Sequence, residues 1–285
     1  MQLLKSILVF SIPLGLSTSI STLNSELDKL VIGNLLRAED VALYTNAAKE
    51  LPITVVPTSI TAVLLPNIVK DIKDGNIKLA INKWADATEM GYLFVCFCAM
   101  ACIVFAPQII TLLYSEKYLP GVSVFRIYSL VLLLRCTFFG MILNATGKTR
   151  LIFYTTLASL AINIVLNYTM FWLVGFNGPA IATTISIFII QFVQLSITSK
   201  VSHVKLIDVF PWKRIISITL VNTVSGILLY FLIKFLGLGT GNKDIVFCVC
   251  IGIIMTILYL LIYRKKIVFL WNRLNQKDDK LILQH

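Results

Sequence analysis

Long apolar segments separated by short polar breaks make up most of the chain. An α-helix needs about 20 apolar residues to cross a hydrocarbon layer about 30 Å thick, and most of these segments reach that length. They predict eight membrane-spanning helices, over residues 6–36, 41–69, 87–114, 121–145, 150–174, 178–199, 212–236 and 244–263. We therefore expect an all-α integral membrane protein.

A shorter amphipathic pattern lies between the second and third of these segments. Apolar positions recur there at spacings of three and four residues, while charged residues occupy the other faces, which is typical of a helix lying in the membrane interface. We expect an interfacial helix over about 75–86. The apolar stripe comprises Ile77, Ala80, Ile81, Trp84 and Thr88, and the charged residues are Lys78, Lys83 and Asp86.

The composition supports a membrane location. Of the 285 residues, 58% are hydrophobic and 14% are charged, whereas a soluble domain has about 25% charged residues. The first apolar segment continues for about 30 residues without a small-residue cleavage site, so we expect a membrane span and not a removable signal peptide.

The distribution of basic residues predicts the orientation. If both termini lie on one side, that side carries 17 of the 25 Lys and Arg residues, and the opposite loops carry Arg37, Lys117, Lys234 and Lys243. Cytoplasmic loops are enriched in Lys and Arg, so both termini should be cytoplasmic. The same enrichment explains the net charge of +11 without a nucleic-acid partner.

Polar residues inside the apolar segments are the best indicators of function, because they usually face a bundle interior or an aqueous cavity. In the first segment, Ser17, Ser21, Asn24 and Asp28 are spaced four, three and four residues apart and share one helical face. We expect this stripe to line a cavity; hydrogen bonding to neighbouring helices is the alternative. Glu26 and Lys29 can pair on another face.

The second segment carries Lys49, followed by Pro52 and Pro57. A proline inside a helix removes a backbone donor and clashes with the preceding turn, so the pair predicts a kinked or broken helix. Such a break can act as a hinge or as a fixed packing kink, and the pattern does not distinguish the two.

Two arginines lie in the fourth segment and two asparagines in the fifth. Arg126 and Arg135 are nine residues apart and hence on opposite faces. We expect the deeper Arg135 to face a cavity and Arg126 to extend toward the interface. Asn163 and Asn167 share a face, where hydrogen bonding between helices and substrate contact are both open.

No pattern indicates an enzyme, a metal site or a cofactor. The six cysteines lie inside apolar segments and show neither zinc-ligand spacing nor a disulfide framework. The glycine-rich stretch at residues 237–241 lies between two spans and lacks the strand and helix of a dinucleotide site. His203 and His285 have no nucleophile arranged around them in the sequence.

Five stretches in order along the first 190 residues resemble the polysaccharide flippases of the MATE-like oligosaccharidyl-lipid transporter superfamily, specifically their second half. They are SIPLGLSTSISTLNSELDKLVIGNLLRAEDVALYTNAAKEL from Ser11, LLPNI from Leu64, FAPQIITLLYSEKY from Phe105, LNATGKTR from Leu143, and NIVLNYTMFWLVGFNGPAIATTIS from Asn163.

The resemblance implies a domain organisation. Residues 1–200 are similar to one six-helix lobe of a two-lobed transporter, residues 201–263 to two additional helices, and residues 264–285 form a basic cytoplasmic tail. The first lobe has no counterpart in this sequence. The resemblance therefore favours a piece of a longer transporter, and assembly with a second copy or with a separate first lobe stays open.

The resemblance also implies a function: flipping of undecaprenyl-diphosphate-linked oligosaccharide units across the bacterial inner membrane for O-antigen or capsule assembly. Lys49 and Arg135 would hold the diphosphate, and Asn24, Asn163 and Asn167 would meet sugar hydroxyls. Asp28 would contact substrate, or a coupling cation as in a drug antiporter. A membrane-embedded glycosyltransferase or polymerase of the same pathway also stays open as a function, as does a non-transporting scaffold.

Overall fold

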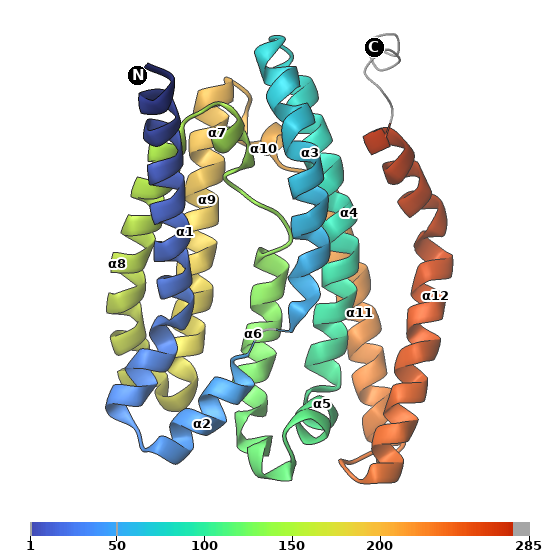
Figure 1. The fold of residues 1–285 in the computed structure, drawn as a ribbon. Coiled ribbons are helices and arrows are strands. Elements are labelled where there is room, and N and C mark those ends of the chain that lie inside the picture. The colour runs from blue at the N-terminus through green and yellow to red at the C-terminus, as the bar shows by residue number, and fades with distance from the viewer. Residues whose placement is uncertain (1, 50, 276–285) are drawn as a thin grey trace.

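A computed structural model describes residues 2–49 and 51–275, and its regular elements in this range are all helical (Figure 1). The first half contains α1 (Gln2–Leu35), α2 (Ala38–Ala47), η1 (Pro52–Thr54), α3 (Val55–Lys73), α4 (Ile77–Val104), α5 (Ala106–Leu113), η2 (Glu116–Gly121) and α6 (Val122–Leu134). The second half contains α7 (Met141–Ala145), α8 (Thr149–Val174), η3 (Gly175–Asn177), α9 (Gly178–Ser202), α10 (Leu206–Val209), α11 (Trp212–Phe235) and α12 (Asn242–Asn275).

Seven helical runs in the described residues are long and apolar enough to cross a membrane. One of them, Thr149–Ser202, has 54 residues and contains both α8 and α9. The chain reverses between these helices at Gly175, whose φ of 71° lies in the left-handed region that favours glycine. The run therefore crosses twice, and the predicted all-α, multi-pass membrane architecture is confirmed.

The helices form two groups that meet along α6. Helices α1, α8 and α9 pack together, while α4 packs against α3, α6, α11 and α12. In Figure 1 the start of α1 and the end of α12 lie at the same end of the molecule as α7 and α10. Helix α2 and the α5–η2 segment lie at the opposite end.

The predicted break in the second span is present. Helix α2 ends at Ala47, and the chain resumes with the short helix η1 at Pro52 and with α3 at Val55. Pro57 lies in the first turn of α3, where the missing N–H group would have had no helical acceptor. The interruption thus precedes both prolines, and hinge motion at Pro52 or Pro57 stays a prediction.

The residues of the expected interfacial helix over 75–86 do not form a separate helix, because Ile77–Val104 is one continuous helix, and their location in the interface stays a prediction. Its apolar stripe faces protein: Ala80, Ile81 and Trp84 are fully or almost fully buried in the core formed with α3, α7 and α9. Of the charged residues on the other faces, Lys83 and Asp86 are also buried, whereas Lys78 is exposed. Lys83 pairs with Asp71 of α3 at 3.0 Å, and this ion pair permits both charges to lie inside the bundle.

Two further segments expected to be single helices are interrupted. In the segment 87–114, α4 ends at Val104 and α5 follows. Pro107 lacks the N–H group that would continue the helical hydrogen bonds of α4. The segment 121–145 divides into α6 and α7, and residues 135–140 are not helical. Side chains from other helices stabilise this second interruption.

The last helix is longer than expected. Helix α12 continues to Asn275, so residues 264–275 of the predicted basic tail are helical, and the remainder of that tail lies outside the described residues. The division of the chain into a lobe over 1–200 and two additional helices stays a prediction.

A network of ion pairs joins α11 and α12 to α4. Two buried carboxylates of α4, Asp86 and Glu89, face three cations from the neighbouring helices. Arg214 of α11 contacts Asp86 at 2.7 Å and Glu89 at 2.9 Å. Lys266 of α12 contacts Glu89 at 2.5 Å, and Arg273 contacts Asp86 at 3.2 Å. The network links α4, α11 and α12 at the end of the molecule where the two termini lie.

Candidate functional site: a polar cleft

Polar side chains from the spanning helices gather in a cleft of about 430 Å³ between the α1–α8–α9 group and α3. Its polar lining comes from α1, η1, α3, the segment after α6, α8 and α9. These residues are Ser17, Thr18, Ser21, Asn24, Ser25, Thr54, Thr58, Arg135, Thr137, Thr156, Ser159, Gln191 and Gln194. In a bundle whose lipid-facing surface is apolar, such a lining indicates a wet compartment.

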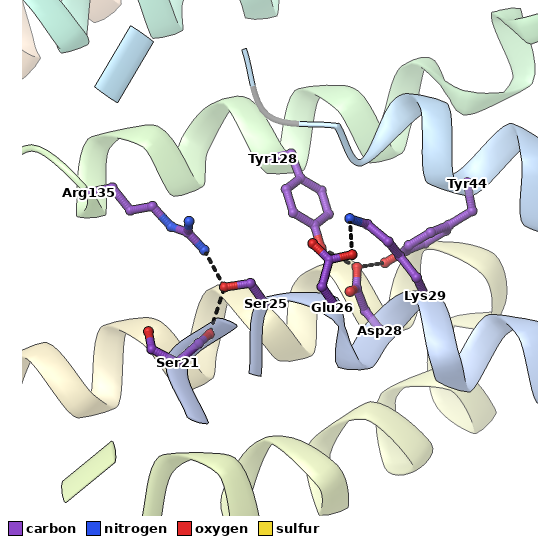
Figure 2. Close-up of polar contacts among 8 residues, drawn as sticks. All are labelled: Ser21, Ser25, Glu26, Asp28, Lys29, Tyr44, Tyr128 and Arg135. Atoms are coloured by element: carbon purple, nitrogen blue, oxygen red, sulfur yellow. Dashed lines mark hydrogen bonds and ion pairs between the residues drawn. The ribbon is translucent and has the colours of Figure 1, made fainter. Parts of the chain in front are cut away.

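Arg135 supplies the charge of this cleft. It follows the last residue of α6, and its guanidinium donates a hydrogen bond from Nη2 to Ser25 Oγ of α1 at 3.2 Å (Figure 2). Ser25 in turn donates to the carbonyl of Ser21 at 2.9 Å. Among the described residues that line the cleft, Arg135 is the one charged side chain. The prediction that Arg135 faces a cavity is consistent with this position.

The interruption after α6 is held by side chains of α4 and α9. Trp84 Nε1 donates to Thr137 Oγ1 at 3.0 Å, and Thr88 donates to the same oxygen at 3.0 Å. Gln191 Nε2 of α9 donates to the Leu134 carbonyl at the end of α6. These bonds replace some of the backbone hydrogen bonds that the interruption removes, and they place Arg135 at the wall of the cleft.

Close packing at Gly91 also positions this wall. A Cβ atom there would lie 2.8 Å from Pro57 Cβ and 3.1 Å from the Cys136 carbonyl oxygen. The absence of a side chain therefore allows α3 and the segment after α6 to approach α4 together.

The three predicted asparagines form a ladder between α1 and α8. Asn163 Nδ2 donates to Asn24 Oδ1 at 2.9 Å and to the Asn24 carbonyl at 3.1 Å, and Asn167 Nδ2 donates to Asn163 Oδ1 at 2.8 Å. Asn163 and Asn167 are fully buried, whereas Asn24 also lines the cleft. The contacts therefore favour hydrogen bonding between helices for Asn163 and Asn167, and their contact with substrate stays a prediction.

Asp28 lies one turn further along α1 and is sealed from the cleft. Its side chain is fully buried, and its Oδ2 atom accepts hydrogen bonds from Tyr44 of α2, at 2.8 Å, and from Tyr128 of α6 (Figure 2). Two hydroxyl donors satisfy a buried carboxylate oxygen. Asp28 thus joins three helices in this conformation, and its predicted substrate contact would require them to separate.

Glu26 and Lys29 pair at 2.6 Å on a different face of α1, as predicted.

Lys49 and Arg135, the two cations predicted to hold a diphosphate, are not brought together. Lys49 follows α2, is exposed, and lines a separate small cavity with Phe125 and Tyr128. The described cleft therefore contains Arg135 without Lys49.

Sequence reasoning missed part of the cleft. Ser25 and Thr137 were not singled out, although Ser25 carries the hydrogen bond to Arg135. Gln191 and Gln194 were also missed, and the sequence did contain a signal for them. An amide inside an otherwise apolar span usually faces protein or water, and the two lie three residues apart in α9.

A second cavity, of about 300 Å³, lies between α4, α5, α11 and α12. Its lining is almost entirely apolar, with residues such as Phe97, Leu229 and Ile253. It suits hydrocarbon and not a charged or sugar headgroup.

Replacing Asn163 by leucine should destabilise the contact between α1 and α8. The change leaves Asn24 Oδ1 without its donor and removes one of the two acceptors of Asn167 Nδ2, at an expected cost of about 2 kcal/mol. Thermal unfolding of the detergent-purified protein measures this loss. Asn67→Leu on the exposed face of α3 is the matched control. Equal unfolding temperatures for the two variants would contradict a structural role for the ladder.

Comparison with known proteins identifies related sequences. Residues 1–123 match the family described as polysaccharide biosynthesis protein. The capsular polysaccharide biosynthesis protein CapF of Staphylococcus aureus is 25% identical over 195 residues, which are 67% of this chain and 48% of CapF. The probable lipid II flippase MurJ of Rhizobium meliloti is 24% identical over 192 residues, which are 64% of this chain and 36% of that protein. The chain thus spans half or less of the length of these relatives.

Solved structures share the fold. A lipid II flippase MurJ in an inward closed conformation superimposes with a TM-score of 0.69 at 20% identity, covering 88% of this chain and 53% of that one. A MOP superfamily transporter from Pyrococcus furiosus gives a TM-score of 0.55 at 18% identity, covering 88% and 60%. The family match and the relatives confirm the predicted resemblance of this chain to polysaccharide biosynthesis proteins and lipid-linked saccharide flippases, and the solved structures show that it shares the fold.

Proposed function

We propose that the chain forms one half of a carrier that moves lipid-linked oligosaccharides across a membrane, with the polar cleft receiving the headgroup. The observation that carries this proposal is a cleft of about 430 Å³ lined by hydroxyl and amide groups around one guanidinium. Moving a sugar through hydrocarbon costs several kcal/mol for each unpaired polar group, and a polar cleft removes most of that cost.

The charge of the cleft favours an anionic substrate. Arginine binds phosphate oxygens through two parallel N–H donors, so Arg135 is suited to a diphosphate. Hydroxyl and amide groups such as Ser21, Asn24 and Gln194 suit sugar hydroxyls. No acidic residue is among the described lining residues, which disfavours the cationic substrates of a drug antiporter.

The carrier needs a second half. Thr18, Ser19, Ser21 and Thr22 are exposed along α1, within a spanning helix. Three of these hydroxyls bond to backbone carbonyls of α1, and a stripe of small hydroxyl residues on a spanning helix favours a protein partner or water at this face over lipid. A separate six-helix lobe or a second copy of the chain would close the cleft, and rocking of the halves about the break near Pro52 and Pro57 would alternate access.

We place this carrier in a bacterial inner membrane with both termini in the cytoplasm. Support comes from the excess of Lys and Arg at the termini side. In this orientation, an inside-negative potential favours outward movement of an anion by about 2.3 kcal/mol per charge per 100 mV.

Replacing Arg135 by glutamine should slow transport roughly tenfold or more, because a hydrogen bond to a charged group contributes about 1.5–3 kcal/mol. The assay uses proteoliposomes that contain the chain together with the first half of a full-length relative. Accessibility of a fluorescent undecaprenyl-diphosphate oligosaccharide to an impermeant quencher reports its movement.

Arg37→Gln, at the end of the molecule opposite the termini and outside the cleft, is the matched control. Movement that depends on neither Arg135 nor the added half contradicts the proposal. Proton-driven efflux of a cationic dye under the same conditions would favour the drug antiporter instead. Transfer or polymerisation of sugar by the chain would favour the enzyme.

A further inference from the structure

Arg126 is a second arginine in a spanning helix, and it lies outside the cleft. It precedes Arg135 by nine residues, which places the two side chains on opposite faces of the α6 region. Arg126 lines a groove of about 380 Å³ between α4, α6 and α11. Its other lining groups include two hydroxyl residues of α11, Thr223 and Tyr230.

The guanidinium is fixed by the end of α4. In a continuous helix the Ile103 carbonyl would accept a hydrogen bond from the residue four positions later, but that residue is Pro107, which has no N–H group. Arg126 Nε donates to the Ile103 carbonyl at 3.1 Å and so replaces the missing donor. This bond holds the side chain in the groove, and the expected extension of Arg126 toward the interface stays a prediction.

Most of the guanidinium donors remain available. Arginine has five N–H donors, and within residues 2–49 and 51–275 Arg126 makes the hydrogen bond to Ile103 and no ion pair. A charge held inside a membrane-spanning segment without an acidic partner is costly. An anion in the groove would remove that cost.

We propose that this groove binds an anionic glycerophospholipid, with its phosphate on the Nη groups of Arg126. The depth is appropriate, because Arg126 lies four residues, or about 6 Å, from the first residue of α6. The groove also faces lipid: Ile227 is 51% exposed and Phe231 is 60% exposed. These two side chains and Met100 provide an apolar surface for the acyl chains.

The position separates this ligand from the transported one. The groove shares no lining residue with the polar cleft, so a diphosphate held by Arg135 cannot reach Arg126 at the same time. The groove is lined by the last residues of α4 and by Arg126 in the first half of α6, and α5, which follows the end of α4, lies at the end of the molecule away from the termini (Figure 1). A lipid seated there would contact α6 on one side and α11 on the other.

Native mass spectrometry of the detergent-purified chain, titrated with dioleoyl-phosphatidylglycerol, tests the proposal. We expect Arg126→Gln to weaken binding about tenfold, because it removes a charge-assisted contact. Lys234→Gln, an exposed cation near the same end of α11 but outside the groove, should change binding less than twofold. Dioleoyl-phosphatidylcholine should bind more weakly than phosphatidylglycerol.

A second variant covers the case in which Arg126→Gln loosens the end of α4. Ile227→Trp fills the groove without touching the hydrogen bond to Ile103, and it should also weaken phosphatidylglycerol binding. Unchanged binding in this variant overturns the proposal. Equal binding of the two lipids by the unmodified chain, or an equal loss with Lys234→Gln, overturns it as well. None of these outcomes depends on flipping, so failure here leaves the proposed function untouched.

Discussion

Substitution of Gly178 by alanine should prevent the chain from reaching a stable fold. Gly178 begins α9 immediately after the turn from α8, and a Cβ atom there would overlap the backbone carbonyl of Met170 in the last part of α8. Backbone cannot rotate away as a side chain does. Relief would require the α8–α9 hairpin to open, at an expected cost of more than about 4 kcal/mol.

Size-exclusion chromatography and thermal unfolding in detergent measure this effect. We expect little monodisperse Gly178→Ala protein and a strongly lowered unfolding temperature in what remains. Gly252→Ala is the matched control, because Gly252 lies inside α12 with open space around its Cβ position. The control should be neutral or stabilised by up to about 1 kcal/mol, since alanine favours helix more than glycine. Normal yield and stability of Gly178→Ala would show that the hairpin is not packed as described.

The apolar pattern predicted most of the fold, because hydrocarbon imposes a length and a composition on every crossing. It did not predict the break over residues 135–140. That segment contains no proline, and its charged residue Arg135 and its glycine Gly140 do not by themselves end a helix. Its conformation depends on Trp84, Thr88 and Gln191, which are distant in sequence and donate the hydrogen bonds that stabilise the interruption and Thr137 within it.

The charged face of α4 was misinterpreted for a related reason. Lys83 and Asp86 indicate a solvated face when only local sequence is considered. Their partners, Asp71 and Arg214, come from α3 and α11. A periodic pattern identifies which residues share a face, but it does not say whether that face meets water or an opposite charge.

The candidate site was predicted in part. The stripe on α1 correctly placed Ser17, Ser21 and Asn24 at the cleft, because helical periodicity within one element is fixed by backbone geometry. The same stripe included Asp28, which two tyrosines on other helices seal. Whether a polar residue faces a cavity or a neighbouring helix depends on tertiary contacts that no local pattern contains.

Replacing Glu89 by glutamine should release α11 and α12 from α4. Glu89 is 2% exposed and contacts both Arg214 and Lys266. Loss of its charge leaves Lys266 without its carboxylate and weakens the hold on Arg214. Removing one partner of a buried ion pair costs about 3–5 kcal/mol. Because both cations are partly exposed to solvent, we expect the lower end of this range, about 3 kcal/mol. Thermal unfolding should begin roughly 10 °C lower.

Glu26→Gln provides the matched control for this prediction. It makes the same chemical change in an ion pair whose acid is 54% exposed, with Lys29 as the partner, and exposed pairs contribute about 0–1 kcal/mol. Adding Lys266→Met to Glu89→Gln should restore part of the lost stability, because it removes the unpaired cation. If the double variant is less stable than Glu89→Gln alone, the Lys266 ammonium group stabilises the contact even without the charge of Glu89, and the cost of Glu89→Gln does not come from an unpaired cation.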